Sequence, residues 1–128
     1  MERSKRNSGR ISVFKGHEAR LNKAIFHVLA LKGPLTIYDI HKELKAQKRL
    51  RQTRYASVNK RVRALEESGY IKKACVKRTK AGFEANMYEP TTRAHLVILL
   101  NSTNLEDLIN ELDEDDALMV LVAILNNI

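Results

Sequence analysis

Residues 53–71, TRYASVNKRVRALEESGYI, combine the spacing of a helix with a dense set of positive charges. Val58, Val62 and Leu65 recur at i, i+4 and i+7, which predicts a helix with one buried face. Because each residue turns a helix by about 100°, Lys60 points almost directly away from that face. The stretch therefore has an apolar side suited to a core and a cationic side that contacts something other than the core.

The ends and edges of this helix can also be predicted. Thr53 is suited to cap its start, and Gly69 is suited to the left-handed conformation that ends a helix. Tyr55 lies beside the apolar stripe, so we expect it to join the core. The side chains expected to face outward or to flank the stripe are Thr53, Ala56, Ser57, Asn59, Lys60, Arg61 and Arg63.

Two shorter helices are predicted before this one, and a hairpin after it. Apolar residues recur at helical spacing in residues 17–31, and Gly33 and Pro34 then stop the helix. The stretch LTIYDIHKELK repeats the pattern, with Thr36 as its N-cap. The segments YIKKACV and EANMYEP are predicted strands around KRTKAGF, a connection that contains Gly82.

Three stretches, DIHKELK, VNKRVRALEESGYIKK and MYEPTTRA, resemble the winged helix-turn-helix domain of prokaryotic transcription regulators. The similarity covers residues 17–93, and its best marker is RALEESGYIKK. It implies that the helix beginning near Thr53 enters the major groove of DNA, and that the loop 77–82 is a wing on the backbone or minor groove. The interval 47–52 departs from the pattern, because it is longer than a tight turn. The expected fold class is mostly α (α+β): three helices, a two-stranded wing and a C-terminal helical extension.

The net charge of +8 is divided unevenly along the chain. Residues 1–90 hold 22 Lys and Arg against 8 Asp and Glu, which gives +14, whereas residues 91–128 hold 1 against 7, which gives −6. Two runs contain no acid: residues 45–63 have eight basic residues and residues 72–80 have five. Packed on one face, these runs would repel each other, and a DNA duplex would relieve the repulsion. An ordinary solvated face is the simpler interpretation of either run alone.

These runs supply the residues predicted to contact DNA. Cations of the hairpin and the interval are expected to bind phosphates. Ser57, Lys60 and Arg63 are better placed to reach base edges, with Asn59 a weaker candidate. Lys or Arg would favour guanine, and Asn would favour adenine. In the third helix the predicted contacts are Thr53, Arg54, Ser57, Asn59, Lys60, Arg61 and Arg63. In the wing they are Lys73, Lys77, Arg78, Thr79 and Lys80, and in the interval they are Lys48, Arg49 and Arg51.

The chain divides into three predicted parts: a basic, flexible N-terminal arm (1–15), a winged helix DNA-binding domain (16–92), and acidic and apolar C-terminal helices (93–128). Within the arm, ISVF is expected to be a short extended piece that packs on the core. RAHLVILL is a predicted helix, and Asn104 can cap another one after it.

The acids of residues 113–116 precede ALMVLVAIL, which is apolar on all sides and must be buried. We expect it to form a homodimer, which would present two reading helices to half-sites about 34 Å apart. The alternative is a cap over the first helix of the same chain. The residues predicted to make the dimer contact are Leu118, Leu121, Val122 and Leu125.

Several classes of protein do not fit the sequence. The longest apolar run has nine residues, whereas a bilayer requires about 20. The first 20 residues lack the apolar core of a signal peptide, so we expect a cytoplasmic protein. Cys75 is the single cysteine, which excludes an intrachain disulfide, and the four histidines lack metal-ligand spacing. Because no Walker-type loop or nucleophile motif is present, we expect no enzyme, metal or cofactor.

The function predicted from these patterns is that of a sequence-specific regulator of transcription that binds double-stranded DNA. Two alternatives use the same fold: a protein-interaction adaptor in a larger assembly, and a nonspecific DNA- or RNA-binding protein. An adaptor would tend to have apolar residues on the outward side of the third helix. The basic residues found there favour the regulator.

Overall fold

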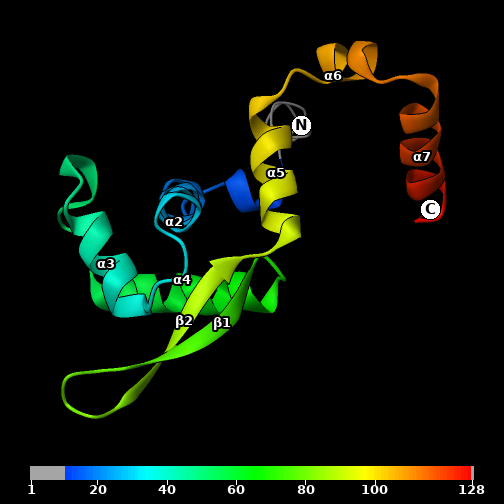
Figure 1. The fold of residues 1–128 in the computed structure, drawn as a ribbon. Helices are drawn as coiled ribbons and strands as arrows, with labels where there is room; N and C mark the ends of the chain where they lie inside the picture. Colours follow the sequence, from blue (N-terminus) through cyan, green and yellow to red (C-terminus); the bar gives the residue numbers. More distant parts are fainter. Residues whose placement is uncertain (1–10, 128) are drawn as a thin grey trace.

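The computed structural model describes residues 11–127 of the chain (Figure 1). It begins with the 3-10 turn η1 (Ser12–Phe14) and the helices α2 (Ala19–Lys32) and α3 (Ile37–Lys45). The 3-10 turn η2 (Lys48–Leu50), helix α4 (Tyr55–Glu67) and the strands β1 (Ile71–Arg78) and β2 (Glu84–Pro90) follow. The helices α5 (Thr92–Ser102), α6 (Leu105–Glu111) and α7 (Glu114–Leu125) complete it. The predicted order of three helices, a hairpin and a helical extension is confirmed.

Most helix boundaries follow the predicted local signals. Gly33 ends α2 with a φ of 80°, and Gly69 has a φ of 82° just after α4, a region of backbone conformation that favours glycine. The hydroxyl of Thr36 accepts a hydrogen bond of 3.1 Å from a backbone N–H in the first turn of α3. Asn104 and Asp113 cap α6 and α7 in the same way.

The core lies between α2, α3, α4 and the base of the hairpin. The apolar stripe of α4 is buried there, with Val58 and Val62 fully enclosed. Val13 and Phe14 of η1 also join the core, and the Phe14 ring meets the Phe26 ring edge-on at 6.1 Å. The segment ISVF therefore packs on the core as predicted, but Ser12–Phe14 form a 3-10 turn rather than an extended piece.

The hairpin is antiparallel and is attached to the helices at its base. Leu35, in the connection between α2 and α3, exchanges two backbone hydrogen bonds of 3.1 and 2.8 Å with Tyr88 of β2. The register shifts between Lys73 and Cys75, which is a bulge in β1. Figure 1 shows the hairpin running past α4 and projecting its loop beyond the helices.

Helix α5 is joined to the core, whereas α6 and α7 extend away from it. Ala94 and Val97 of α5 are buried, and the Thr91 hydroxyl donates a 2.6 Å hydrogen bond to the Gly69 carbonyl. By contrast, α6 and α7 contain no buried residue. In Figure 1, α5 lies between α2 and α7, so α7 is not a cap over the first helix.

Candidate nucleic-acid interface

The outward face of α4, formed by Ala56, Ser57, Lys60 and Arg63, is exposed. The buried stripe fixes the rotation of the helix, because α4 packs against α2, α3 and β1 at once. The first turn of α4 contains no acidic residue. A surface with this charge and these small side chains can approach a polyanion closely.

The edge of α4 that faces α2 is occupied by an internal contact. Arg61 donates a 3.1 Å hydrogen bond from its Nε to Oδ1 of Asn22, and the same Nε lies 3.6 Å from a carboxylate oxygen of Glu18. Its side chain is only 19% exposed. The structure therefore separates Arg61 from the other predicted contacts of this helix.

The opposite edge of α4 faces β1. Glu66 lies there with an oxygen 4.0 Å from Nζ of Lys73. Two turns earlier, Asn59 accepts a 3.1 Å hydrogen bond through Oδ1 from Nε of Arg63. Because this bond uses Nε, it leaves the two terminal nitrogen atoms of the guanidinium out of the contact.

At the start of α4, the predictions for Thr53 and Tyr55 are both wrong. Its N-cap is Arg54, which makes no side-chain capping bond, so the prediction that Thr53 caps this helix is wrong. The carbonyl of Thr53 instead accepts a 2.8 Å hydrogen bond from Nε2 of His41, which fixes the approach to α4 from α3. The prediction that Tyr55 joins the core is also wrong: it is 46% exposed and its ring meets His41 edge-on at 5.7 Å.

The interval between α3 and α4 is shaped by the turn η2. Leu50 is buried and anchors the turn to the core. The three predicted backbone contacts, Lys48, Arg49 and Arg51, surround it and are all exposed. One apolar anchor therefore holds three cations at the surface next to the start of α4.

The wing, which consists of β1, β2 and the loop 79–83, carries cations that differ in their surroundings. Nζ of Lys77 lies 3.5 Å from a carboxylate oxygen of Asp39 on α3. Arg78 and Lys80 are exposed near and in the loop. Thr79 is half-buried, and its Oγ1 accepts a 3.2 Å hydrogen bond from the backbone N–H of Phe83, so its side chain helps to close the loop.

These contacts place the wing beside the helices. The pairs Glu66–Lys73 and Asp39–Lys77 connect β1 with α4 and with the first turn of α3. The edge of α4 that holds Glu66 therefore faces the hairpin, and Figure 1 shows the two strands passing beside α4. The structure brings α4 and β1 of the wing together, and it turns Arg61 toward the interior.

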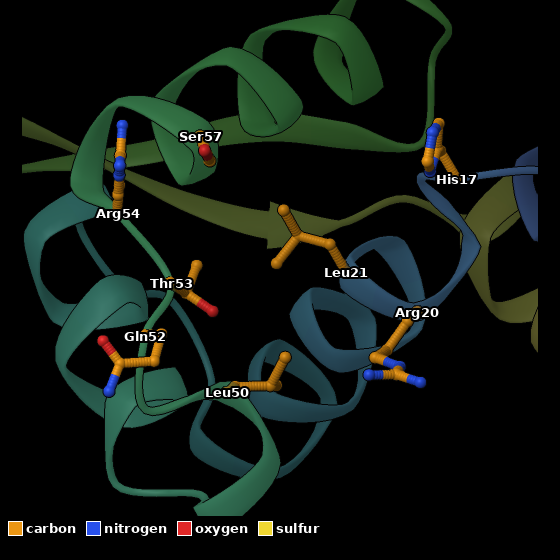
Figure 2. A pocket seen from close by; sticks show the side chains of 8 residues that line it. All are labelled: His17, Arg20, Leu21, Leu50, Gln52, Thr53, Arg54 and Ser57. Carbon is orange, nitrogen blue, oxygen red and sulfur yellow. The ribbon is translucent and has the colours of Figure 1, made fainter.

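A hollow that the sequence did not reveal lies on the α2 side of α4. It is open to the surface and has a volume of about 420 Å³. Figure 2 shows the residues that line it, which are His17, Arg20, Leu21, Leu50, Gln52, Thr53, Arg54 and Ser57. His17 and Arg20 were visible in the sequence as basic residues at the start of α2. Nothing in the sequence indicates that they lie next to the start of α4.

A second feature missed from the sequence is Phe83, an aromatic side chain that is 72% exposed in the wing loop. Cys75, also in the wing, is exposed, with its Sγ 3.5 Å from Sδ of Met87. Within residues 11–127, no group of three His, Cys, Asp or Glu side chains is arranged to bind a metal ion, and no helix is long and apolar enough to cross a membrane.

Comparisons with known proteins give limited similarity. No protein-family model matches the sequence, and no curated protein matches it. TA0346 from Thermoplasma acidophilum, provisionally described as a transcriptional regulator, aligns in structure with a TM-score of 0.49 and 15% identity, over 76% of this chain and 100% of its own. A mutant of ZitR from Lactococcus lactis aligns with a TM-score of 0.44 and 19% identity, over 88% of this chain and 78% of its own.

The fold is assigned from the helices and strands of the chain itself. Helices α2, α3 and α4 form a three-helix core, and the last of them is followed by a two-stranded hairpin. The connection between the first two helices pairs with the base of that hairpin. The chain has a winged helix-turn-helix fold with a C-terminal helical extension.

Proposed function

We propose that this protein is a sequence-specific, double-stranded DNA-binding regulator of transcription. In the proposal, α4 enters the major groove and the wing contacts the backbone or the minor groove. The observation that supports the proposal is the exposure of cations on α4, on η2 and on the wing, with Lys60 and Lys80 among them. A duplex is the polyanion whose grooves suit a helix and a hairpin held side by side.

The contacts within this surface support a division of roles. Arg63 is held through Nε by Asn59, so its terminal nitrogen atoms can donate together to O6 and N7 of a guanine. Asn59 then acts as a positioning residue rather than as a reader of adenine. The cations of η2 and of the wing loop are exposed, which suits them to phosphates.

We further propose that the protein acts as a homodimer through its C-terminal helices. Leu118, Leu121, Val122 and Leu125 of α7 are each 46–58% exposed, and Met119 on the same helix is 70% exposed. An apolar surface of this kind on a single chain marks a contact with another molecule. A second copy fits the proposed function, because two reading helices can then occupy two half-sites.

The proposal is tested by measuring affinity for duplex DNA at several salt concentrations. Fragments selected from genomic DNA supply a preferred sequence, and an unrelated duplex of equal length supplies the comparison. We expect Lys60→Ala and Arg63→Ala each to reduce the preference by about 5- to 150-fold, which corresponds to 1–3 kcal/mol per lost base contact. Lys80→Ala should weaken both duplexes equally and reduce the salt slope by about 1.

The remaining outcomes separate the proposal from its alternatives. Absence of duplex binding even at low salt would reject DNA recognition and favour the protein-interaction adaptor. Binding with no preference for any selected fragment would favour a nonspecific nucleic-acid-binding protein. Lys32→Ala is the matched control. Lys32 is the last residue of α2 and pairs with Glu43, so its substitution should leave both affinities unchanged.

A further inference from the structure

The hollow between α2 and α4 shares part of its lining with the proposed interface. Thr53, Arg54 and Ser57 line the hollow and also belong to the predicted contacts of the third helix. Its other side is formed by α2 and the residues just before it, where Arg20 and His17 contribute polar side chains. The proposed reading surface therefore continues past α4 onto α2.

The lining of the hollow has the chemistry of an anion site with an apolar floor. Leu21 and Leu50 supply the apolar part, and Figure 2 shows Arg20 and Arg54 at opposite edges with Leu21 between them. Among residues 11–127, eight line the hollow, and none of these eight is acidic. The nearest acid in sequence, Glu18, lies 3.6 Å from Arg61 and is paired with it.

The shape of the hollow favours a group that is carried by a large molecule. The volume of about 420 Å³ is open to solvent, so a free small anion would lose little contact with water and would be held weakly. A phosphate of a polymer that is already bound through α4 and the wing arrives at a high effective concentration. The polar side chains at the rim, with their donors, suit the oxygen atoms of a phosphodiester.

The position of the hollow relative to the wing identifies which phosphate it can take. The Arg61 edge of α4 faces α2, and the Glu66 edge faces β1, so the hollow and the wing flank α4 on different sides. The major groove is about 12 Å wide and has a phosphate backbone on each side. We propose that the hollow binds a backbone phosphate of the DNA strand opposite to the strand that the wing contacts.

This inference rests on the proposed function, and Arg20 provides its test. We expect Arg20→Gln to weaken binding to a duplex of about 20 base pairs by roughly three- to tenfold at moderate salt, equally for preferred and unrelated sequences. The slope of log affinity against log salt should fall by about 1, and Arg20→Lys should restore it. Lys32→Gln removes the same charge about 18 Å further along α2 and should retain the wild-type slope.

A second measurement locates the phosphate. Single phosphates of the preferred duplex are replaced by neutral methylphosphonates, and affinity is measured for the wild type and for Arg20→Gln. One replaced position, on the strand away from the wing, should weaken the wild type but have no further effect on Arg20→Gln. Additive effects at every position would overturn the inference, as would equal slopes for Arg20→Gln and Lys32→Gln.

The remaining results separate this inference from the proposed function and from a free ligand. If the wild type binds no duplex, the proposed function fails first, whereas duplex binding that is indifferent to Arg20 rejects the hollow alone. Inorganic phosphate is the probe for a free anion. If millimolar phosphate shifts the NMR signals of His17 and Arg20 while duplex DNA leaves them unchanged, the hollow binds a small phosphate ligand and the inference is wrong.

Discussion

At the scale of single residues, Asn22 shows how one buried amide connects three segments. It is 2% exposed, its Nδ2 donates a 2.9 Å hydrogen bond to the Val13 carbonyl, and its Oδ1 accepts a 3.1 Å hydrogen bond from Arg61. These bonds join η1, α2 and α4. The same bonds hold Arg61 toward the interior, away from the outward face of α4.

We expect Asn22→Ala to lower the free energy of unfolding by about 1–3 kcal/mol, because it leaves the Val13 carbonyl and the Arg61 Nε without this partner. Urea unfolding followed by circular dichroism measures the change. Asn86→Ala, at an exposed position of β2, is the control and should change stability by less than about 0.5 kcal/mol. Equal effects of the two substitutions would contradict this account.

The residues that were predicted correctly and those that were not differ in a physical way. Thr36, Gly33 and Gly69 act on backbone within a few residues of themselves, so the sequence alone is sufficient to identify them. Arg61 and Tyr55 lie at the edges of the apolar stripe of α4, where a small rotation of the helix about its axis decides whether a side chain is buried or exposed. Partners distant in the sequence, such as Asn22 for Arg61, decide that rotation.

At the scale of elements, α4 starts without a capping side chain, as α2 also does. Within residues 11–127, four helices have a side chain that caps the first turn, provided by Thr36, Thr91, Asn104 and Asp113. Helix α4 instead has Arg54 at the N-cap, in an extended conformation with φ −87° and ψ 147°. A capping side chain would stabilise α4, whereas a cation at this position is suited to DNA.

We expect Arg54→Ser to raise the free energy of unfolding by about 0.5–1 kcal/mol, because the serine hydroxyl can accept an N–H of the first turn. The same substitution should weaken duplex binding by roughly threefold or more, because it removes a phosphate contact. Arg54→Gln is the control, since it removes the charge without adding a good cap, and it should lower affinity with no gain in stability. If Arg54→Ser is no more stable than Arg54→Gln, the missing cap does not lower the stability of the protein.

The longer elements were predicted better than the short ones. Three helices, both strands and the C-terminal helices follow from periodic apolar residues and from turn residues. The turns η1 and η2 have three residues each, too few for a period to be visible. The hollow was equally inaccessible, because it arises where Arg20 and Ser57, which are distant in sequence, line one surface.

At the scale of the whole molecule, the core and the apolar extension are separate. The buried cluster ends at Val97, and the large apolar side chains that follow it, from Leu99 through Leu125, are exposed or only partly buried. The extension holds acids but no Lys or Arg beyond Arg93, so it has no means of binding DNA by charge. A single chain therefore has one surface suited to DNA and another suited to a second copy.

We expect the wild-type protein to be a dimer and Leu121→Lys to be a monomer, because a lysine within an apolar contact between copies must lose its hydration without a partner. Light scattering coupled to size exclusion measures the two masses. Asn110→Lys adds the same charge at an exposed position of α6 and should remain dimeric. A monomeric wild type, or a dimer unaffected by Leu121→Lys, would reject the proposed contact.

The separation of charge along the chain has a consequence for the kinetics of encounter. Residues 11–90 hold 18 Lys and Arg against 7 Asp and Glu, which gives +11. The acids of the extension lie on α6 and α7, away from the core (Figure 1), so the part of the chain that the structure describes has an electric dipole. Near a polyanion, the field exerts a torque that turns the basic end forward and the acidic end away before any atoms touch. Collisions are then productive more often than for a uniformly charged protein, and the advantage fades as ions shorten the Debye length to about 8 Å.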